Sequence, residues 1–435
     1  MQEVPPTAAV NAPIDMVVAH PAAPMADAGR IGSMDVLRGF ALLGILVMNI
    51  QSFAMPGAAY INPTAYGNFE GADFWVWYVS HIFADQKFMT LFSMLFGAGI
   101  VLMTTNVERQ GRSPAALHYR RMAWLILFGI LHGYLLWYGD ILFLYGVCGM
   151  LVYPMRRWRP GWLILVGVLV VSVASILSLL QGWAMQLMPQ EDIDAIMVEM
   201  WQPTAETQQA EIAEMRSGFA QQILHRAPGT FMFQTLMVMV WGLWRAGGLM
   251  LIGMALFKLG VFSGRRSTRL YLAMTLIGAC IGIPVILYGV QRNFAEDWRG
   301  EYSFFVGSQY NYWASLLVSL AWVGAVMLMC RAAFWRSVLT PIGAVGRMAL
   351  TNYLMQTILC TLIFNGHGLG LFGRVERTGQ VAIVLGVWAV QLIVSPLWLR
   401  RFQFGPFEWL WRSLTYFKLQ PVRRGRREAS PGGAG

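Results

Sequence analysis

Charged side chains inside otherwise apolar stretches of the sequence are the first candidates for chemistry. There are six of them, three acids and three bases: Asp35, Asp85, Asp140, Arg38, Lys87 and Arg245. A charge at membrane depth costs at least ~2.5–3.5 kcal/mol, so each of these side chains needs a partner or a purpose. Equal numbers of both signs fit ion pairs that only hold helices together, and they fit a substrate site or path equally well.

The apolar stretch at 34–55 places three polar side chains on one helix face. Asp35 and Arg38 are three residues apart, a spacing at which side chains meet on the same face. Asn49 follows Arg38 by eleven residues, which returns it to within about 20° of that face at a rise of ~16 Å. We expect a charged pair at the cytoplasmic end of this helix and an amide in its outer half. The alternative is that Asn49 only makes an interhelical hydrogen bond.

The next apolar stretch, 74–104, carries Asp85 and Lys87 in its outer half. Gly97 lies near the same face as Lys87, and a small residue there allows a neighbouring helix to approach closely. The alternative is that residues 74–84 form a helix at the membrane interface, which would leave both charges at the water boundary.

His132, Asp140 and Arg245 complete the set of candidates. His132 lies near mid-depth, and histidine titrates near neutral pH, which suits a general base. The alternative is a neutral histidine bonded to a backbone carbonyl. Asp140 lies just before the next apolar stretch, where aspartate is a favoured helix cap. Arg245 keeps its proton, so it must meet a carboxylate, carbonyls or a bound anion.

The composition predicts the elements that position these residues. Of the 435 residues, 57% are apolar and 12% are charged, whereas about 25% are charged in soluble domains. This excludes a soluble enzyme, a nucleic-acid-binding protein and a disordered chain. We predict an all-α, polytopic helical membrane protein with about ten transmembrane helices of ~20 residues. The predicted spans are 34–55, 74–104, 118–138, 139–155, 160–183, 231–257, 268–290, 308–330, 343–364 and 380–399.

The basic residues predict the orientation of these spans. Of the 32 lysines and arginines, 23 fall in the tails and in alternate loops, six in the other loops and three within spans. Cytoplasmic loops carry the excess of positive charge, so both termini are expected in the cytoplasm. The expected organisation is a disordered cytoplasmic tail (1–30), a transmembrane domain (31–418) and a basic cytoplasmic tail (419–435). Within the domain we expect a large outer loop (184–230) and an interfacial helix (404–418).

Motifs for several common chemistries do not occur in the sequence. It has no HExxH, GxSxG, P-loop, dinucleotide fingerprint or CxxC pair. We therefore expect no metal site, no nucleotide hydrolysis and no serine-hydrolase chemistry. The expected partner is the lipid bilayer and not a nucleic acid, and a homo-oligomer stays open.

The segment 30–50, RIGSMDVLRGFALLGILVMNI, resembles the YeiB family of bacterial membrane proteins, which carries the domain of unknown function 418. Further similar stretches are 87–99, 132–145, 245–258, 346–356 and 404–418. The segment 30–50 is also similar to the first span of the transmembrane acyltransferase superfamily. That superfamily includes the membrane O-acetylases of polysaccharides and heparan-α-glucosaminide N-acetyltransferase. The heparan enzyme has an asparagine at the position of Asn49 and a catalytic histidine eleven residues later, where this chain has Tyr60.

The resemblance implies an acyltransferase in the bacterial inner membrane. It would move an acyl group, such as acetyl, from cytoplasmic acyl-CoA to an envelope glycan or a small exported acceptor. Asp35 and Arg38 would shape the cytoplasmic entrance, with Arg30 and loop arginines meeting the CoA phosphates. Asn49 would polarise the thioester carbonyl.

Because the superfamily histidine is replaced, the base would be His132 with Asp140, or Asp85. Lys87 and Arg245 would bind substrate. For this chemistry Asn49, Asp85 or Lys87, and His132 should converge on one cavity that opens to the cytoplasm.

Two alternatives remain at this stage. A transporter or exporter of a small solute would use the intramembrane charges as its substrate or proton path. A membrane scaffold without enzymatic activity would use the same polar groups only for packing.

Overall fold

The computed structural model describes residues 32–423, and within this range the chain is built of helices. The predicted tail at 1–30, with Arg30, and residues 424–435 of the predicted basic tail lie outside the described residues. The elements are α1 (Gly32–Ala54), α2 (Ala58–Ile61), α3 (Gly71–Phe83), α4 (Lys87–Arg109), α5 (Ala115–Leu135), α6 (Leu142–Val152), η2 (Tyr153–Arg157), α7 (Pro160–Met185), α8 (Gln190–Met200), α9 (Ala205–Met215), α10 (Phe219–Met232), η3 (Phe233–Gly242), α11 (Leu243–Lys258), α12 (Thr268–Ala295), α13 (Gly300–Tyr302), η4 (Ser303–Gly307), α14 (Ser308–Arg331), η5 (Ala333–Trp335), α15 (Arg336–Arg347), α16 (Ala349–Phe364), α17 (Arg377–Arg401) and α18 (Pro406–Tyr416).

The long helices are those of a multi-pass membrane protein. Seven helical segments of the described chain are long and apolar enough to cross a membrane: Gly32–Ala54, Gly71–Arg109, Pro160–Met185, Phe219–Lys258, Thr268–Ala295, Gly300–Arg331 and Arg377–Arg401. The other three predicted spans correspond to α5, α6 and α16, which do not meet these criteria. At ~1.5 Å per residue, the 11 residues of α6 extend only about 16 Å.

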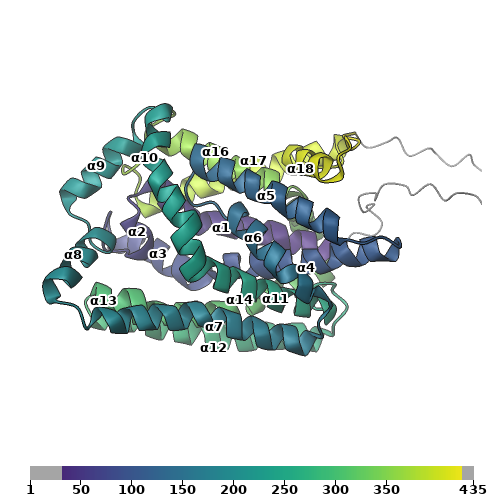
Figure 1. Ribbon diagram of the computed structural model, residues 1–435, viewed down its shortest axis with the longest axis horizontal. Helices are drawn as coiled ribbons and strands as arrows, with labels where there is room; N and C mark the ends of the chain where they lie inside the picture. Colours follow the sequence, from purple (N-terminus) through teal and green to yellow (C-terminus); the bar gives the residue numbers. More distant parts are fainter. Residues whose placement is uncertain (1–31, 424–435) are drawn as a thin grey trace, which may run out of the picture.

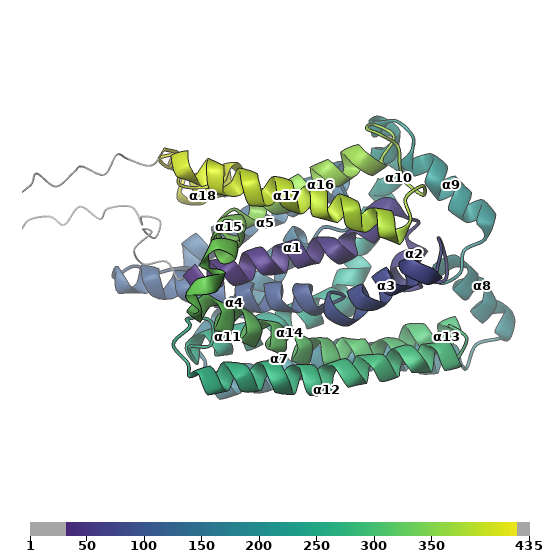
Figure 2. The same ribbon diagram turned by 180° about the vertical axis from the view of Figure 1, so that it is seen from behind.

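The helices run between two ends of one bundle (Figure 1). One end, which we call the basic end, gathers the start of α1, the ends of α4 and α11, and α15 and α18 (Figure 2). There Lys258 Nζ donates a hydrogen bond to the Trp158 carbonyl at 2.6 Å, and Ser33 Oγ donates one to the Phe262 carbonyl at 2.9 Å. Basic loops that are far apart in the sequence therefore lie together, as the charge alternation predicts.

The opposite end is covered by the segment predicted as a large outer loop. Residues 184–230 fold largely as three helices, α8, α9 and α10. Thr204 caps α9 by accepting a hydrogen bond from the Thr207 N–H at 3.2 Å. Glu211 of α9 accepts a hydrogen bond from the Gly57 N–H at 2.9 Å, which ties this cover to the end of α1.

The predicted continuous span at 74–104 is broken in the structure. Gln86 has a left-handed conformation with φ of 62°, so α3 ends before it and α4 begins after it. Lys87 at the break is fully buried, whereas Asp85 is half-buried. The predicted unbroken span is therefore wrong. A separate helix precedes the break, as the alternative predicts for residues 74–84, and Lys87 after the break is buried within the bundle.

Close helix contacts depend on glycine, as predicted for Gly97. A Cβ at Gly97 would overlap the carbonyl oxygen of Met250, and a Cβ at Gly253 would overlap that of Met94. The backbones of α4 and α11 therefore touch at two reciprocal positions. The same reciprocal contact joins α1 to α15 through Gly39 and Gly346.

Candidate functional site

A buried histidine–carboxylate pair lies where α5, α6 and α16 meet. His132 Nδ1 is 2.9 Å from Asp140 Oδ1, and His132 Nε2 is 3.0 Å from Thr357 Oγ1. None of the three residues is more than 2% exposed. Asp140 Oδ2 accepts a hydrogen bond from the Phe143 N–H at 2.7 Å, which confirms the predicted cap of α6. The alternative of a histidine bonded to a backbone carbonyl is wrong, because both ring nitrogens face side chains.

Local sequence explains why these groups can meet. His132 lies in the last turn of α5, and Asp140 follows in the short connection to α6. Gly129 lies three residues before His132, and a Cβ there would be 2.6 Å from Asp140 Oδ2 and would overlap the Phe143 nitrogen. The missing side chain thus lets the start of α6 pack directly on α5.

A cavity of about 180 Å³ lies between this pair and the basic end. We call it the arginine chamber. Its polar lining comprises Arg38, His118, Arg121, Tyr145, Arg347, Tyr353, Glu408 and Arg412, and its walls include Phe92, Phe96, Leu125 and Leu142. Four arginines and one carboxylate line it, and one of the arginines, Arg38, is paired with Asp35 outside the chamber. Arginine is the side chain best suited to bind an anion, and the apolar walls suit an uncharged chain.

Tyr353 forms the boundary between the arginine chamber and His132. Its ring centroid is 5.1 Å from that of His132, and its Oη accepts a hydrogen bond from the Ile141 N–H at 3.3 Å. The chamber therefore ends one aromatic ring away from the histidine.

Glu408 of α18 provides the single carboxylate of the chamber lining and caps α16. It accepts hydrogen bonds from the Leu350 N–H at 2.6 Å, the Thr351 N–H at 3.0 Å and the Thr351 hydroxyl at 2.5 Å. The pKa of Glu408 is raised above its usual value, because the effect of burial exceeds the opposing effect of these hydrogen bonds. The helix predicted at 404–418 is present as α18, and it contributes a wall of the chamber.

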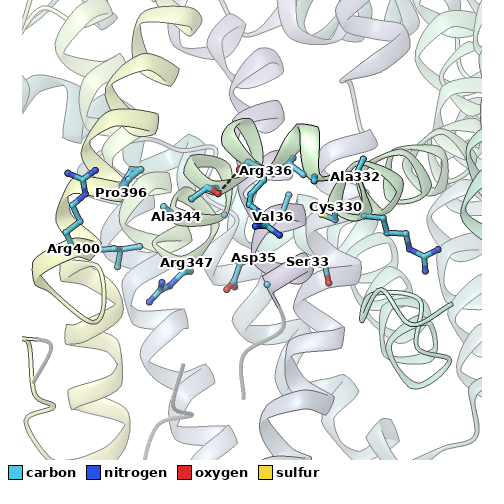
Figure 3. Close-up of a pocket in the computed structure, with 17 residues that line it drawn as sticks. Ser33, Asp35, Val36, Cys330, Ala332, Arg336, Ala344, Arg347, Pro396 and Arg400 are labelled. Atoms are coloured by element: carbon cyan, nitrogen blue, oxygen red, sulfur yellow. Dashed lines mark hydrogen bonds between the residues drawn. The ribbon is translucent and has the colours of Figure 1, made fainter. Parts of the chain in front are cut away.

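A wider pocket of about 790 Å³ lies at the same end of the bundle (Figure 3). Its lining includes Asp35, Arg331, Arg336, Arg347 and Arg400, contributed by α1, α14, α15 and α17. Arg347 also lines the arginine chamber, so this side chain separates the two spaces.

The predicted pair at the start of α1 is confirmed. Arg38 Nη1 is 3.2 Å from Asp35 Oδ1. Arg38 faces the arginine chamber and Asp35 faces the wider pocket. The pair therefore stands between two arginine-lined spaces, at the end of the bundle where the sequence predicts an entrance.

Asp85 and Lys87 belong to a different polar group, which we call the Asn311 cluster. Lys87 Nζ donates to Asn311 Oδ1 at 2.5 Å, and Asn311 Nδ2 donates to Asp85 Oδ2 at 2.7 Å. His81 Nδ1 lies 3.2 Å from the same Asp85 oxygen. Asn311 thus bridges the predicted acid and base at the break between α3 and α4.

Arg245 is fully buried beside the Asn311 cluster, where its two terminal nitrogens contact hydroxyls and a carbonyl while its Nε has no hydrogen-bond partner. Its guanidinium donates to Ser315 Oγ at 2.6 Å, Thr90 Oγ1 at 3.1 Å and the Tyr312 carbonyl at 3.1 Å. It also lies 4.1 Å from the centroid of the Tyr312 ring. The sequence predicts a carboxylate, carbonyls or a bound anion as the partner of Arg245. One of its three described hydrogen bonds goes to a carbonyl, and the other two go to hydroxyls.

Neither of the two cavities described above shows the predicted convergence of Asn49, Asp85 or Lys87, and His132. Asn49 is half-buried and lines neither space, while its carbonyl accepts a hydrogen bond from Ser52 at 2.9 Å. No described hydrogen bond or ion pair joins the Asn311 cluster to His132. The reason is geometric. Sequence spacing predicts which residues share one face of a helix, but it does not predict which neighbouring helix packs against that face.

Several residues of the site were not selected from the sequence. They are Arg121, Arg347, Tyr353, Thr357, Glu408 and Arg412. Arg347 and Tyr353 lie within the similar stretch at 346–356, whereas a lone threonine in an apolar helix gave no signal for Thr357. Within residues 32–423, no group of three or more His, Cys, Asp or Glu side chains could hold a metal.

Comparison with known proteins gives a family but no activity. The model described as "Protein of unknown function (DUF418)" matches residues 256–418. YeiB of Escherichia coli (strain K12), described as uncharacterized, is 34% identical over 90% of this chain and 97% of its own. YxaH of Bacillus subtilis (strain 168), described in the same way, is 33% identical over 91% of this chain and 96% of its own. No solved structure matches. The chain therefore belongs to the DUF418 family, together with YeiB and YxaH.

Proposed function

We propose that the protein is a membrane acyltransferase that takes an acyl group from cytoplasmic acyl-CoA and passes it to an envelope glycan or a small exported acceptor. The observation that carries the proposal is the arginine chamber, which ends at Tyr353, with His132 behind that ring at 5.1 Å between centroids. The resemblance of the first span to the transmembrane acyltransferase superfamily gives the reaction class.

Acyl-CoA fits the chemistry of this lining. Arginine suits the phosphates of acyl-CoA, because its guanidinium binds phosphate through paired hydrogen bonds. The thin pantetheine arm of acyl-CoA needs a narrow, largely apolar passage, and the apolar walls of the arginine chamber match that need. The pocket of about 790 Å³ beyond Arg347 has room for the nucleotide.

The histidine has the surroundings of a general base. Asp140 accepts a hydrogen bond from the Nδ1–H, which leaves the proton-accepting lone pair on Nε2, the nitrogen that faces Thr357. When a hydroxyl or amine attacks the thioester carbon, its proton passes to Nε2 and then to the departing thiolate. We assign this role to His132 and not to Asp85, because Asp85 is bonded within the Asn311 cluster.

For the topology we infer about ten crossings with both termini in the cytoplasm, in the bacterial inner membrane. α5, α6 and α16 join the seven long segments as shorter crossings within the bundle. The concentration of arginine and lysine at the basic end supports the cytoplasmic assignment.

Binding and turnover of labelled acetyl-CoA by the purified protein in lipid nanodiscs test this function. With membrane extract as acceptor, we expect CoA release and transfer of label. Arg121→Ala should weaken acetyl-CoA binding about 10–100-fold, because it removes a charged hydrogen-bond donor from the chamber. Arg401→Ala is the matched control, since this arginine is exposed and lines neither space. Wild-type protein that neither binds nor cleaves acetyl-CoA would refute the proposal.

The second candidate is a transporter of a small solute, and the Asn311 cluster is the observation that favours it. Buried charges of this kind often mark a substrate or proton path. Efflux from a deletion strain separates the two functions. Transport predicts that Asp85→Asn abolishes efflux while His132→Ala retains it, and catalysis predicts that transfer depends on His132.

A further inference from the structure

The Thr357 hydroxyl lies closer to His132 than to the carbonyl one turn earlier in its own helix. Serine and threonine in membrane helices usually donate to the carbonyl one turn earlier. Ser93 does so at 2.8 Å and Thr104 at 2.9 Å. For Thr357 the corresponding carbonyl of Tyr353 is 3.5 Å away, whereas His132 Nε2 is 3.0 Å away.

The donor and acceptor of each hydrogen bond between Thr357, His132 and Asp140 follow from the chemistry of the three side chains. An ionised Asp140 has no proton, so His132 Nδ1 must donate to it. The neutral ring then has only a lone pair on Nε2, and the Thr357 hydroxyl must donate to that lone pair. The sequence of groups is hydroxyl, imidazole and carboxylate, which is the arrangement that activates a nucleophilic oxygen.

Asp140 is itself held in place, which completes this arrangement. Its second oxygen accepts the Phe143 N–H at 2.7 Å, so the carboxylate cannot turn away from the ring. The hydroxyl, imidazole and carboxylate residues are all nearly inaccessible to water. An acyl ester formed there would be protected from hydrolysis.

Thr357 is also placed at the end of the arginine chamber. It lies four residues after Tyr353, which puts both side chains on the same face of α16. The Tyr353 ring forms the end wall, so acyl transfer to Thr357 requires this side chain to move aside.

We propose that Thr357 is an acyl-accepting nucleophile and that transfer proceeds through an acyl-threonine intermediate; this inference rests on the acyltransferase function proposed above. In the first half-reaction Thr357 Oγ1 bonds to the thioester carbonyl carbon while its proton passes to His132 Nε2. The carbon–sulfur bond breaks, and the CoA thiolate takes that proton and leaves as the thiol.

The second half-reaction restores the enzyme. The acceptor hydroxyl gives its proton to His132 Nε2 as its oxygen bonds to the ester carbon. The bond from that carbon to Thr357 Oγ1 breaks, and the threonine oxygen recovers the proton. No oxidant, reductant or metal is needed, and Asp140 stabilises the imidazolium formed in each half.

The test is a single turnover of labelled acetyl-CoA by full-length protein in nanodiscs without acceptor. We expect one acetyl group on the peptide that contains Thr357, together with release of one CoA. Thr357→Ala should abolish this label and lower CoA release at least ~100-fold, whereas Thr357→Ser should keep both. Thr361→Ala is the matched control, because Thr361 is a buried threonine one turn further along α16 whose hydroxyl donates to the Ile358 carbonyl.

The outcomes distinguish the two proposals. If wild-type protein releases CoA and transfers acetyl but carries no label on Thr357, or if Thr357→Ala transfers at the wild-type rate, the nucleophile is refuted and the acyltransferase stands. If wild-type protein neither binds nor cleaves acetyl-CoA, both are refuted. Circular dichroism and size-exclusion profiles of each variant establish that the protein is folded.

Discussion

The crossing of α1 and α15 makes a sharp prediction, because Gly39 and Gly346 bring two backbones into contact beside both arginine-lined spaces. The perturbation is Gly346→Ala. The added Cβ would lie 2.6 Å from the Gly39 nitrogen and 2.9 Å from the Asp35 carbonyl carbon, and it would overlap the Asp35 carbonyl oxygen. No rotation of the new methyl group relieves these contacts, since all three atoms belong to the backbone.

The size of the effect follows from these distances. Carbon atoms in contact prefer separations of about 3.5–4.0 Å, so the contact with the Asp35 carbonyl carbon alone requires a movement of roughly 0.6 Å or more, and the overlap with the carbonyl oxygen requires α1 and α15 to move further apart than that. Overpacking of this kind costs about 1–3 kcal/mol. The same movement displaces Arg38 and Arg347, which line the chamber. We therefore expect both a lower unfolding temperature and weaker binding of acetyl-CoA.

Thermal unfolding in detergent, followed by intrinsic fluorescence, measures the first effect. The control is Gly343→Ala, which adds the same methyl group to the same helix three residues earlier. Its Cβ would lie 3.4 Å from Val36 Cγ2, a contact that the flexible end of that side chain can relieve. Equal unfolding temperatures for the two variants would refute the argument that backbone contact at Gly346 sets the spacing of α1 and α15.

Three further predictions concern other buried groups. Arg245→Ala should destabilise the protein by at least ~2 kcal/mol, because two hydroxyls and a carbonyl lose their donor in a water-free site; unchanged thermal unfolding would contradict this. Arg377→Ala should raise hydrogen exchange and proteolysis selectively within 62–73, because the Arg377 guanidinium donates to the carbonyls of Pro63, Tyr66 and Asn68. Unaltered protection of that segment would show that these hydrogen bonds do not hold it in place. Burial raises the pKa of Glu408 above its usual value of 4.5, so the folded protein keeps this proton to a higher pH than the unfolded chain does. Wild-type protein should therefore lose stability relative to Glu408→Gln as the pH rises from 4.5 through the raised pKa, and parallel curves of unfolding temperature against pH would refute the shift.

Much of the architecture could be predicted from the sequence because the bilayer acts on each segment separately. An apolar stretch of sufficient length must be helical, since its backbone has no water to bond. Each of the ten predicted stretches is largely helical in the structure, and seven helical segments meet the criteria for spanning. Local features such as the Asp140 cap and the Asp35–Arg38 pair were predicted because they depend on neighbours in sequence. Gly97 was predicted as a position of close helix approach, but its partner Met250 was not.

The break at Gln86 shows where local reasoning fails. Nothing in the apolar pattern of 74–104 indicates a left-handed residue, and the break is stabilised by Asn311, which lies 224 residues beyond Lys87. Asn49 illustrates the same limit, because its face on α1 was predicted but the groups facing it were not.

The sequence by itself determined that this chain is a helical, multi-pass membrane protein whose basic loops gather at one end, since hydrophobicity and charge act through the solvent on each segment. Only the tertiary structure decided which polar groups meet. His132 and Thr357 are 225 residues apart in sequence, and the arginines of the chamber come from α1, α5, α15 and α18. Their meeting depends on how ridges and glycine contacts fix the rotation of each helix against its neighbours. That rotation is a property of the packed bundle, because no single helix contains it.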